Sequence, residues 1–219
     1  AQWKAYFYDA NGNGIQDVEE AYIPSMQEYE VLNPDKISRI VEKTTTKYTD
    51  AATKYVGKSA IPKIRGAFTL STQFKGFSLS AQFLYSLGGY AFDAAYRVLM
   101  SSGKVGENNW HTDIINRWTK AGDVTDVPRL SNAQDVSANG TSTRFIVKAD
   151  YLALNNVRLG YTMPNDYLQH LAVSELNFWV SGDNLLLSSA RKGFNPSTSE
   201  NGNSDTYRYS PMSTISLGV

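Results

Sequence analysis

Hydrophobic and polar residues alternate strictly along two neighbouring stretches in the first half of the chain. In residues 66–75, GAFTLSTQFK, aromatic and aliphatic side chains alternate with Thr, Ser, Gln and Lys, and residues 76–86, GFSLSAQFLYS, repeat the pattern. A period of two is that of a β-strand, whose successive side chains point to opposite faces. The stretches meet at Lys75 and Gly76, so the pattern predicts two antiparallel strands joined by a tight turn.

Four further stretches predict strands, namely residues 1–8, 147–161, 174–187 and 212–219. In the second of these, the residues in phase are Tyr151, Ala153, Val157, Leu159 and Tyr161. The chain thus contains six predicted strands. We expect them to lie side by side in one antiparallel sheet, paired in sequence order.

The predicted strands are joined alternately by long and short connections. Residues 9–65, 87–146 and 188–211 are long, whereas the turn at 75–76 and residues 162–173 are short. Such alternation is typical of outer-membrane β-barrels, which have short turns on one side and long loops on the other. Six strands cannot close such a barrel, since about eight is the minimum. The pattern therefore predicts an all-β fold, a partial set of antiparallel strands from a large transmembrane β-barrel with long outer loops.

The composition of the two strand faces agrees with a barrel. Ser, Thr, Gln and Gly suit a water-filled interior, and Phe, Leu, Ile and Tyr suit lipid. Tyr85, Tyr151 and Tyr161 are candidates for the aromatic residues at the membrane interface. The alternative is a secreted β-sandwich, a glycan-binding or adhesin module whose apolar face is its core. Burial separates the two, because Phe68, Leu70, Phe77 and Leu79 face lipid in a barrel but pack inside a sandwich.

Composition narrows the functional classes. Lys plus Arg number 21 and Asp plus Glu also 21, so a basic surface for nucleic acid is not predicted. The chain has no cysteine, which excludes disulfides and thiolate metal sites. No G-x-S-x-G motif or other catalytic constellation is present, so we do not expect an enzyme.

Residues 9–20, DANGNGIQDVEE, fill the pattern D-x-[DN]-x-[DN]-G-x₅-E of a calcium-binding loop. The predicted calcium ligands are the side chains of Asp9, Asn11, Asn13, Asp17 and Glu20 and the backbone carbonyl of Ile15. The loop follows a strand-like segment and precedes a proline-containing one, so it is not the helix-flanked loop of an EF-hand sensor. We expect a structural calcium loop. An ordinary Asn/Gly turn is the alternative.

The long connection 87–146 holds the remaining candidates. Trp110 and Trp118 stand eight residues apart in NNWHTDIINRW, which predicts a short helix. They could form a substrate-binding platform that stacks on sugar rings, or they could pack inside the loop. His111 is expected to hydrogen-bond within the loop rather than bind a ligand.

Several segments also resemble, in the same order, runs of the SusC-like (RagA-type) TonB-dependent outer-membrane transporters. They are DANGNGIQDVEE, IPKIRGAFTLSTQFKGFSLSAQFLYSLGG, HTDIINRWTKAGDVTDVPRLS, ADYLALNNVRLGYTMP, VSGDNLLLSSARKGFNP and YSPMSTISLGV. Asn13 departs from this pattern, because the family usually has Asp there. Residues 21–58 resemble an insertion.

The resemblance implies that residues 1–219 are the carboxy-terminal part of a TonB-dependent barrel domain, without the plug domain. The whole protein would import oligosaccharides or peptides across an outer membrane. Its implied partners are the TonB energy-coupling complex, a SusD-like surface lipoprotein that caps the barrel, and the outer-membrane lipid. Residues 87–146 would then lie on the outer side, at the lid or the substrate cavity.

Overall fold

The computed structural model describes residues 3–101, 106, 109–130, 136–169, 173–191, 193–198 and 210–219. These residues fall into two compact units, residues 1–58 with 96–144 and residues 59–95 with 145–219. No helix among the described residues is long and apolar enough to cross a membrane. The strands are β1 (Trp3–Tyr8), β2 (Ile40–Thr45), β3 (Ile64–Phe74), β4 (Phe77–Leu87), β5 (Tyr90–Phe92), β6 (Ile146–Lys148), β7 (Tyr151–Thr162), β8 (Asn177–Ser189) and β9 (Thr214–Gly218).

Short helices occupy the connections. The α-helices are α1 (Met26–Leu32), α2 (Ala94–Leu99) and α3 (Asn165–Leu168). The 3₁₀ helices are η1 (Pro34–Arg39), η2 (Tyr48–Asp50), η3 (Thr112–Asn116), η4 (Val136–Asn139), η5 (Thr143–Phe145) and η6 (Pro196–Thr198).

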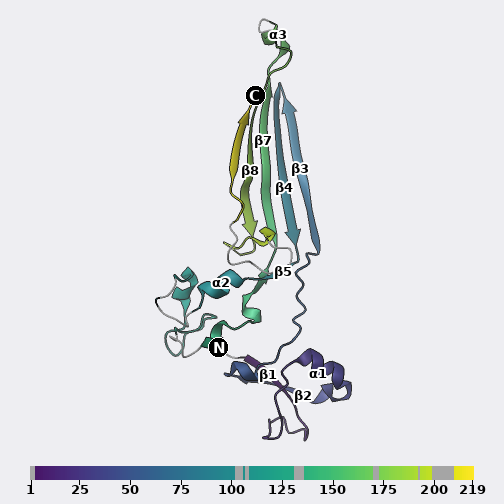
Figure 1. The fold of residues 1–219 in the computed structure, drawn as a ribbon, viewed down its shortest axis with the longest axis vertical. Helices are drawn as coiled ribbons and strands as arrows, with labels where there is room; N and C mark the ends of the chain where they lie inside the picture. Colours follow the sequence, from purple (N-terminus) through teal and green to yellow (C-terminus); the bar gives the residue numbers. More distant parts are fainter. Residues whose placement is uncertain are drawn as a thin grey trace. The chain divides into compact units, whose positions relative to one another are not determined.

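A five-stranded antiparallel sheet dominates the second unit, in the order β3-β4-β7-β8-β9 (Figure 1). The five strands thus lie in the sheet in the same order as along the chain, as predicted. The tightest connection is the turn between β3 and β4, where Lys75 has a φ of 47° and Gly76 a φ of 85°. Two successive residues with positive φ match the right-handed twist of a hairpin. A Cβ at Gly76 would also lie 2.7 Å from the Thr162 carbonyl oxygen, so glycine is required there.

The connections of this sheet alternate between its two ends. The β3–β4 turn, the β7–β8 connection with α3, and Val219 lie at one end, which we call the turn edge (Figure 1). The long β4–β7 and β8–β9 connections leave from the opposite end, the loop edge. Part of the expected long connection 188–211, namely residues 192 and 199–209, lies outside the described residues. The described remainder agrees with the predicted alternation of short and long connections.

The prediction that residues 1–8 form a sixth strand of this sheet is wrong. β1 pairs instead with β2 in a two-stranded sheet, with Trp3 opposite Thr45 and Tyr8 opposite Ile40. Strand β2 was not predicted, because its residues IVEKTT place two aliphatic side chains next to each other rather than at alternate positions. The Lys4 ammonium lies 2.6 Å from the Glu42 carboxylate across the pair.

The first unit has hydrophobic clusters of its own. Tyr6, Ile23 and Met26 form one, with Tyr29, Ile40 and Ala52 packed against it. Helix α1 begins at this cluster, and the Glu28 amide donates to the Ser25 hydroxyl as an N-terminal cap. Met100, Ile114 and Val127 form a second cluster, with Tyr96, Trp110 and Leu130 around it. These long connections are therefore packed rather than extended.

The predicted strand 147–161 is divided into two strands. β6 pairs with β5 in a separate two-stranded sheet, and β7 begins three residues later at Tyr151. Asp150 lies at the break, where its carboxylate accepts a hydrogen bond of 2.6 Å from the Gly88 amide. Because that bond ties the start of β7 to the end of β4, it fixes the position at which the chain turns out of the large sheet.

Candidate functional site

The five-stranded sheet has two chemically different faces. The strand register brings alternate residues of all five strands to one face, where most of the large side chains are hydrophobic. Those between 41% and 79% exposed are Ile64, Phe68, Leu70, Phe74, Phe77, Leu79, Leu87, Leu152, Leu159, Phe178, Leu186, Ile215 and Leu217. No buried hydrophobic residue of the described chain lies in these five strands. The apolar face therefore has the exposure expected of a lipid-facing wall rather than of a sandwich core.

The opposite, polar face is built from hydroxyl, amide and small residues. In the half of the sheet near the turn edge, three successive rungs of paired residues cross all five strands. Their members are Gln73, Ser78, Gly160, Trp179 and Gly218; then Ser71, Ser80, Arg158, Ser181 and Ser216; then Thr69, Gln82, Asn156, Asp183 and Thr214. This composition suits contact with water or a polar ligand.

A β-bulge changes the phase of β7 at Asn155. Gln82 of β4 pairs with Asn156 and Phe83 with Leu154, so Asn155 is an extra residue in β7. Tyr151 and Ala153 are therefore on the polar face, and the prediction that they share a face with Val157 is wrong. The expected place of Tyr151 at a lipid interface is wrong for the same reason, whereas Tyr85 and Tyr161 remain on the apolar face.

Asparagine side chains hold this bulge in place. The Asn155 side-chain amide donates to the Gln82 side-chain oxygen at 3.0 Å, and the Asn156 side-chain amide donates to the Asp183 carboxylate at 2.7 Å. In β8 the distortion continues at Asn184, which has a φ of 52°. Asparagine tolerates that left-handed conformation better than other residues with a Cβ. Asn155, Asn156 and Asn184, which lie in segments that resemble the transporter family, thus have a structural role.

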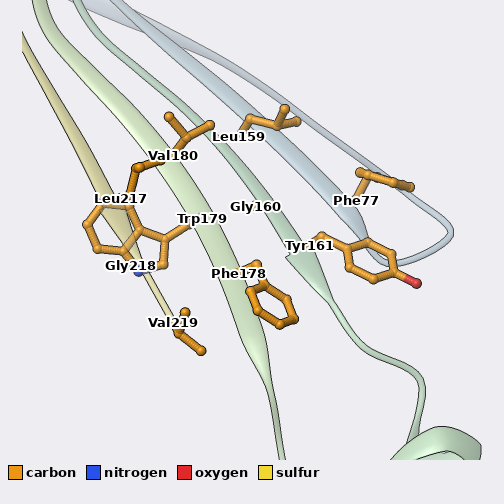
Figure 2. A pocket seen from close by; sticks show the side chains of 10 residues that line it. All are labelled: Phe77, Leu159, Gly160, Tyr161, Phe178, Trp179, Val180, Leu217, Gly218 and Val219. Carbon is orange, nitrogen blue, oxygen red and sulfur yellow. The ribbon is translucent and has the colours of Figure 1, made fainter.

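A groove lies on the sheet at the turn edge (Figure 2). Its lining residues come from β4, β7, β8, β9 and the residue that follows β9, namely Phe77, Leu159, Gly160, Tyr161, Phe178, Trp179, Val180, Leu217, Gly218 and Val219. The Trp179 indole lies beside Gly218, where a Cβ would come within 2.3 Å of the ring. Gly218 is therefore needed for the indole to lie flat against β9.

The predicted calcium loop is closed around Asp9. The Asp9 carboxylate accepts hydrogen bonds from the amides of Gly12 at 2.6 Å, Asn13 at 3.2 Å and Gly14 at 2.7 Å. Asp9 is only 4% exposed. The Gly14 amide, followed by those of Gly12 and Asn13, lowers the pKa of the Asp9 carboxyl below its usual range against the opposing effect of burial. The loop thus keeps an ionised carboxylate at its first ligand position.

The other predicted ligands are drawn into the same loop. Glu20 accepts hydrogen bonds from the Ala10 and Asp17 amides at 2.8 and 3.1 Å. Asp17 in turn accepts from the Asn11 and Asn13 side-chain amides at 2.6 and 3.4 Å. The donor set of carboxylate and amide oxygens fits the oxygen chemistry of calcium. In the described chain no three Asp, Glu or His side chains gather as a metal site, and N–H groups contact these oxygens. The structure thus brings the predicted residues together but leaves calcium binding a prediction.

The structure places Trp110 and Trp118 on either side of η3. Trp110 packs against the cluster of Met100, Ile114 and Val127, and its indole N–H donates to the Ser101 carbonyl at 2.9 Å. Trp118 is 37% exposed, and its backbone amide donates to the Val127 carbonyl. Trp110 thus has the packing role named as the alternative. A role of either indole in substrate binding stays a prediction.

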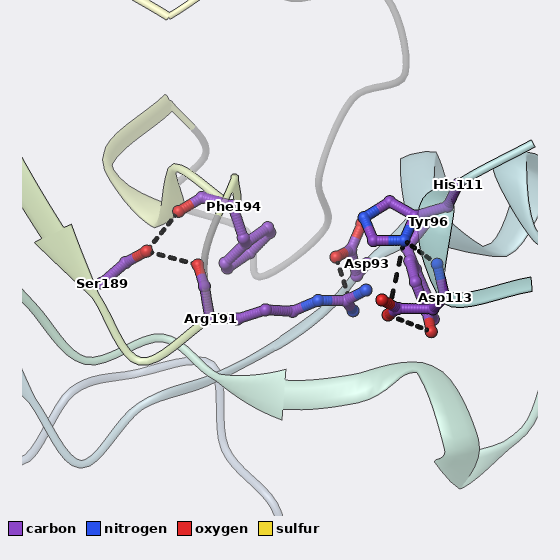
Figure 3. A network of polar contacts seen from close by, with 7 residues as sticks. All are labelled: Asp93, Tyr96, His111, Asp113, Ser189, Arg191 and Phe194. Carbon is purple, nitrogen blue, oxygen red and sulfur yellow. Dashed lines mark hydrogen bonds and ion pairs between the residues drawn. The ribbon is translucent and has the colours of Figure 1, made fainter. Parts of the chain in front are cut away.

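Two polar contacts in the long connections were not predicted (Figure 3). Within the second unit, Arg191 lies 2.9 Å from the Asp93 carboxylate, and both side chains are largely buried. The Ser189 hydroxyl donates to carbonyl oxygens of the same turn, those of Arg191 and Phe194. Asp93 and Arg191 are 98 residues apart, so sequence spacing carried no signal of their pairing.

His111 has the hydrogen-bonding role that was predicted. Its Nδ1 accepts a hydrogen bond from the Asp113 amide at 3.1 Å and so caps η3 (Figure 3). The Tyr96 hydroxyl donates to the Asp113 carboxylate at 2.9 Å, and the Tyr96 ring meets the His111 ring edge to face. These contacts brace the start of the helix between the two tryptophans.

Curated proteins with similar sequences are TonB-dependent receptors, whereas no family model matches the chain. TonB-dependent receptor P39 of Formosa agariphila is 24% identical over 160 residues, which cover 70% of this chain and 15% of the receptor. TonB-dependent receptor P3 of the same organism is 27% identical over 135 residues, which cover 62% of this chain and 13% of the receptor. The chain therefore spans about one seventh of the length of these relatives.

Solved structures give a consistent result. The RagAB peptide importer in its closed-closed state matches 81% of this chain and 19% of its own, with a TM-score of 0.67 and 27% identity. Its open-open state matches 99% of this chain and 21% of its own, with a TM-score of 0.66 and 23% identity. The fold is that of antiparallel barrel strands of a TonB-dependent transporter. More narrowly, the resemblance to SusC-like transporters that the motifs indicated is confirmed.

Proposed function

We propose that this chain supplies wall strands and outer loops to an outer-membrane active transporter of the SusC-like kind. The observation that carries the proposal is the two-faced sheet, with exposed hydrophobic side chains on one face and hydroxyl and amide groups on the other. A membrane-spanning wall needs this combination, because one side meets lipid and the other lines a wet interior. The similarity to TonB-dependent receptors supports the same function.

The imported substrate is an oligosaccharide or a peptide. The peptide is supported by the RagAB structures, whose protein is described as a peptide importer. Energy would come from a TonB complex acting through regions outside these 219 residues, and a SusD-like lipoprotein would cap the barrel. In this proposal the chain is a carboxy-terminal piece of the barrel domain, and the plug lies elsewhere in the whole protein.

The topology predicts which connections are outside the cell. If Val219 ends on the periplasmic side, the turn edge is periplasmic, and the β4–β7 connection leaves the sheet on the outer side. Val124 is fully exposed in that connection, and Tyr167 is 68% exposed in the β7–β8 connection at the turn edge. Both side chains offer room for a cysteine without disturbing packing.

Cysteine labelling of the full-length protein on whole cells tests this assignment. Val124→Cys is expected to react with a membrane-impermeant maleimide, and Tyr167→Cys is expected to react only after the cells are opened. Because the chain has no native cysteine, this segment contributes no background. Labelling of Tyr167→Cys alone on intact cells would reverse the topology. Equal labelling of both would contradict a membrane-spanning wall.

We also propose that the loop of residues 9–20 binds a structural calcium ion. The Asp9, Asn11, Asn13, Asp17 and Glu20 side chains and the Ile15 carbonyl would hold it, and the buried, ionised Asp9 supports this assignment. Calorimetric titration of the full-length protein with calcium is expected to give a binding heat. The double variant Asp9→Ala, Glu20→Ala is expected to lose it. Equal heats for both proteins would refute the site.

A further inference from the structure

One positively charged side chain stands in an otherwise uncharged row of hydroxyl groups on the polar face. The register places Arg158 of β7 in one rung with Ser71, Ser80, Ser181 and Ser216. Directly paired residues of antiparallel strands have Cβ atoms roughly 4.5–5.5 Å apart. The Ser80 and Ser181 hydroxyl groups therefore flank the Arg158 stem on both sides.

The Arg158 guanidinium is stacked on an aromatic platform. Its central carbon lies 4.6 Å from the centre of the Trp179 ring, which belongs to the next rung toward the turn edge. Figure 2 shows the Trp179 indole beside Gly218, whose missing side chain leaves the space that the ring fills. Gly160, the partner of Trp179 on β7, also adds no side chain there. The indole therefore fills the space beside Gly218, and the guanidinium lies over its ring.

No carboxylate of the described chain neutralises Arg158. The ion pairs Lys4–Glu42 and Arg191–Asp93 join other described residues and do not involve Arg158. The acidic residue in the adjacent rung, Asp183, instead accepts a hydrogen bond from the Asn156 side chain at 2.7 Å. Stacking uses the flat surface of a guanidinium and leaves the N–H donors at its rim available. Arg158 thus presents an oriented set of donors on the polar face.

We propose that Arg158, Trp179 and the flanking serines form a binding subsite for a carboxylate group. A guanidinium rim matches the two oxygens of a carboxylate, and charge-assisted pairs of this kind are among the stronger hydrogen bonds. The neighbouring serine hydroxyls can donate to the same oxygens. The proposal rests on the proposed function only in taking the polar face as the transporter interior.

The carboxylate could come from two sources with the same chemistry. One is an imported peptide, through its carboxy terminus or an acidic side chain. The other is an acidic side chain of the whole protein outside residues 1–219. Both would place a planar anion over the Arg158 rim, so the experiment has to identify the molecule that carries the carboxylate.

Carbodiimide coupling to a lysine at this position separates the two sources. The full-length Arg158→Lys variant is treated with carbodiimide in the presence of a short peptide with a free carboxy terminus, and residue 158 is mapped by mass spectrometry. The matched control is Arg65→Lys, because Arg65 lies on the same face at the far end of β3, opposite Ser86. An amide bond to the added peptide would identify the imported ligand. An amide bond to an acidic residue outside residues 1–219 would identify the whole protein itself as the source of the carboxylate.

Coupling at residue 158 is expected to exceed coupling at residue 65 clearly. Equal coupling at both positions, or coupling of residue 158 to Asp183 alone, would overturn the proposal. A second measurement does not depend on the folding of the lysine variant. Acetate is titrated into the protein and the tryptophan fluorescence is recorded. The contribution of Trp179 is the part of the emission that is lost in Trp179→Phe. If no upstream carboxylate couples, acetate should change this emission in the unsubstituted protein, and Arg158→Gln should weaken its binding by on the order of tenfold or more. If acetate has no effect and no coupling occurs, the subsite is refuted. The membrane topology tested by maleimide labelling is independent of that result.

Discussion

Hydrophobic side chains are exposed in the five-stranded sheet but buried in the unit of residues 1–58 and 96–144. The sheet leaves Leu70, Phe74 and Leu217 between 60% and 79% exposed, although it is the most regular part of the chain. The other unit has only two short strands in its sheet, yet it buries Phe7 to 1% and Ile23 and Met26 to 3%. Regular structure and a buried core are thus separated in this molecule.

This difference indicates two different surroundings. In water, folding is driven by removing apolar surface from the solvent, and the clusters around Met26 and Met100 follow that rule. In a bilayer, apolar side chains are stable while exposed, but every backbone polar group must be paired. The sheet satisfies the second requirement along β4, β7 and β8, which are paired on both sides. The sheet thus has the properties expected in lipid, and the packed connections have those expected in water.

The largest expected effect comes from a charge on the apolar face. Leu70→Arg is expected to destabilise the full-length protein in lipid vesicles by about 2–4 kcal/mol, the cost of an arginine near the bilayer centre. Ser71→Arg, one residue further on the polar face of the same strand, should change stability little. Urea unfolding in vesicles measures both. A larger loss of stability for Ser71→Arg than for Leu70→Arg would mean that the polar face, not the apolar face, meets the lipid.

The next effect tests the packing of Trp179 on Gly218. A Cβ at Gly218 would lie 2.3 Å from the indole, so Gly218→Ala must displace the ring. Overpacking of this kind typically costs about 1–3 kcal/mol. In the double variant with Trp179→Ala the obstacle is gone, so the added alanine should cost clearly less than in the parent protein. Additive costs in this double-mutant cycle would contradict the packing.

The sequence predicted most of the sheet because its strands follow a single rule. Alternation in residues 66–75 and 76–86 indicated β3, β4 and the turn between them, and it also separated the two faces. The phase of β7 was not predictable in the same way. Alternation assumes one residue for each step of the neighbouring strand, and Asn155 breaks that assumption.

Long-range pairing sets the other limit. The hydrophobic residues of 1–8 predicted a strand correctly, but no local pattern indicated that its partner would be residues 40–45 rather than the large sheet. The predicted calcium-loop residues are together because their spacing is local. Asp93 and Arg191, in contrast, meet only through the fold.

A smaller effect is expected inside the water-facing unit, at Tyr6. Burial, followed by the hydrogen bond to Glu42, raises the pKa of Tyr6 from 10.0 to about 12. A raised pKa means that the stability from this neutral hydroxyl is complete below pH 10.0 and is lost as the pH rises through about 12. Tyr6→Phe should cost about 1 kcal/mol at neutral pH. Alkaline unfolding with and without this substitution checks the window, and identical profiles would contradict it.

The smallest expected effect is confined to the loop of residues 9–20. The pKa of Asp9 lies below 3.8 because the Gly14, Gly12 and Asn13 amides donate to its carboxylate. A lowered pKa means that this carboxylate stabilises the loop fully above pH 3.8, and that the contribution is lost as the pH falls through the folded-state value. At acid pH the loop should therefore open more often. Hydrogen exchange at the Gly12 and Gly14 amides should then be faster than the intrinsic pH dependence of exchange predicts. Asp9→Asn should show that opening already at neutral pH, while amides in β7 keep their protection in both proteins. Loss of protection in β7 at the same pH would mean that the loop and the sheet unfold together, and that the two regions are not independent.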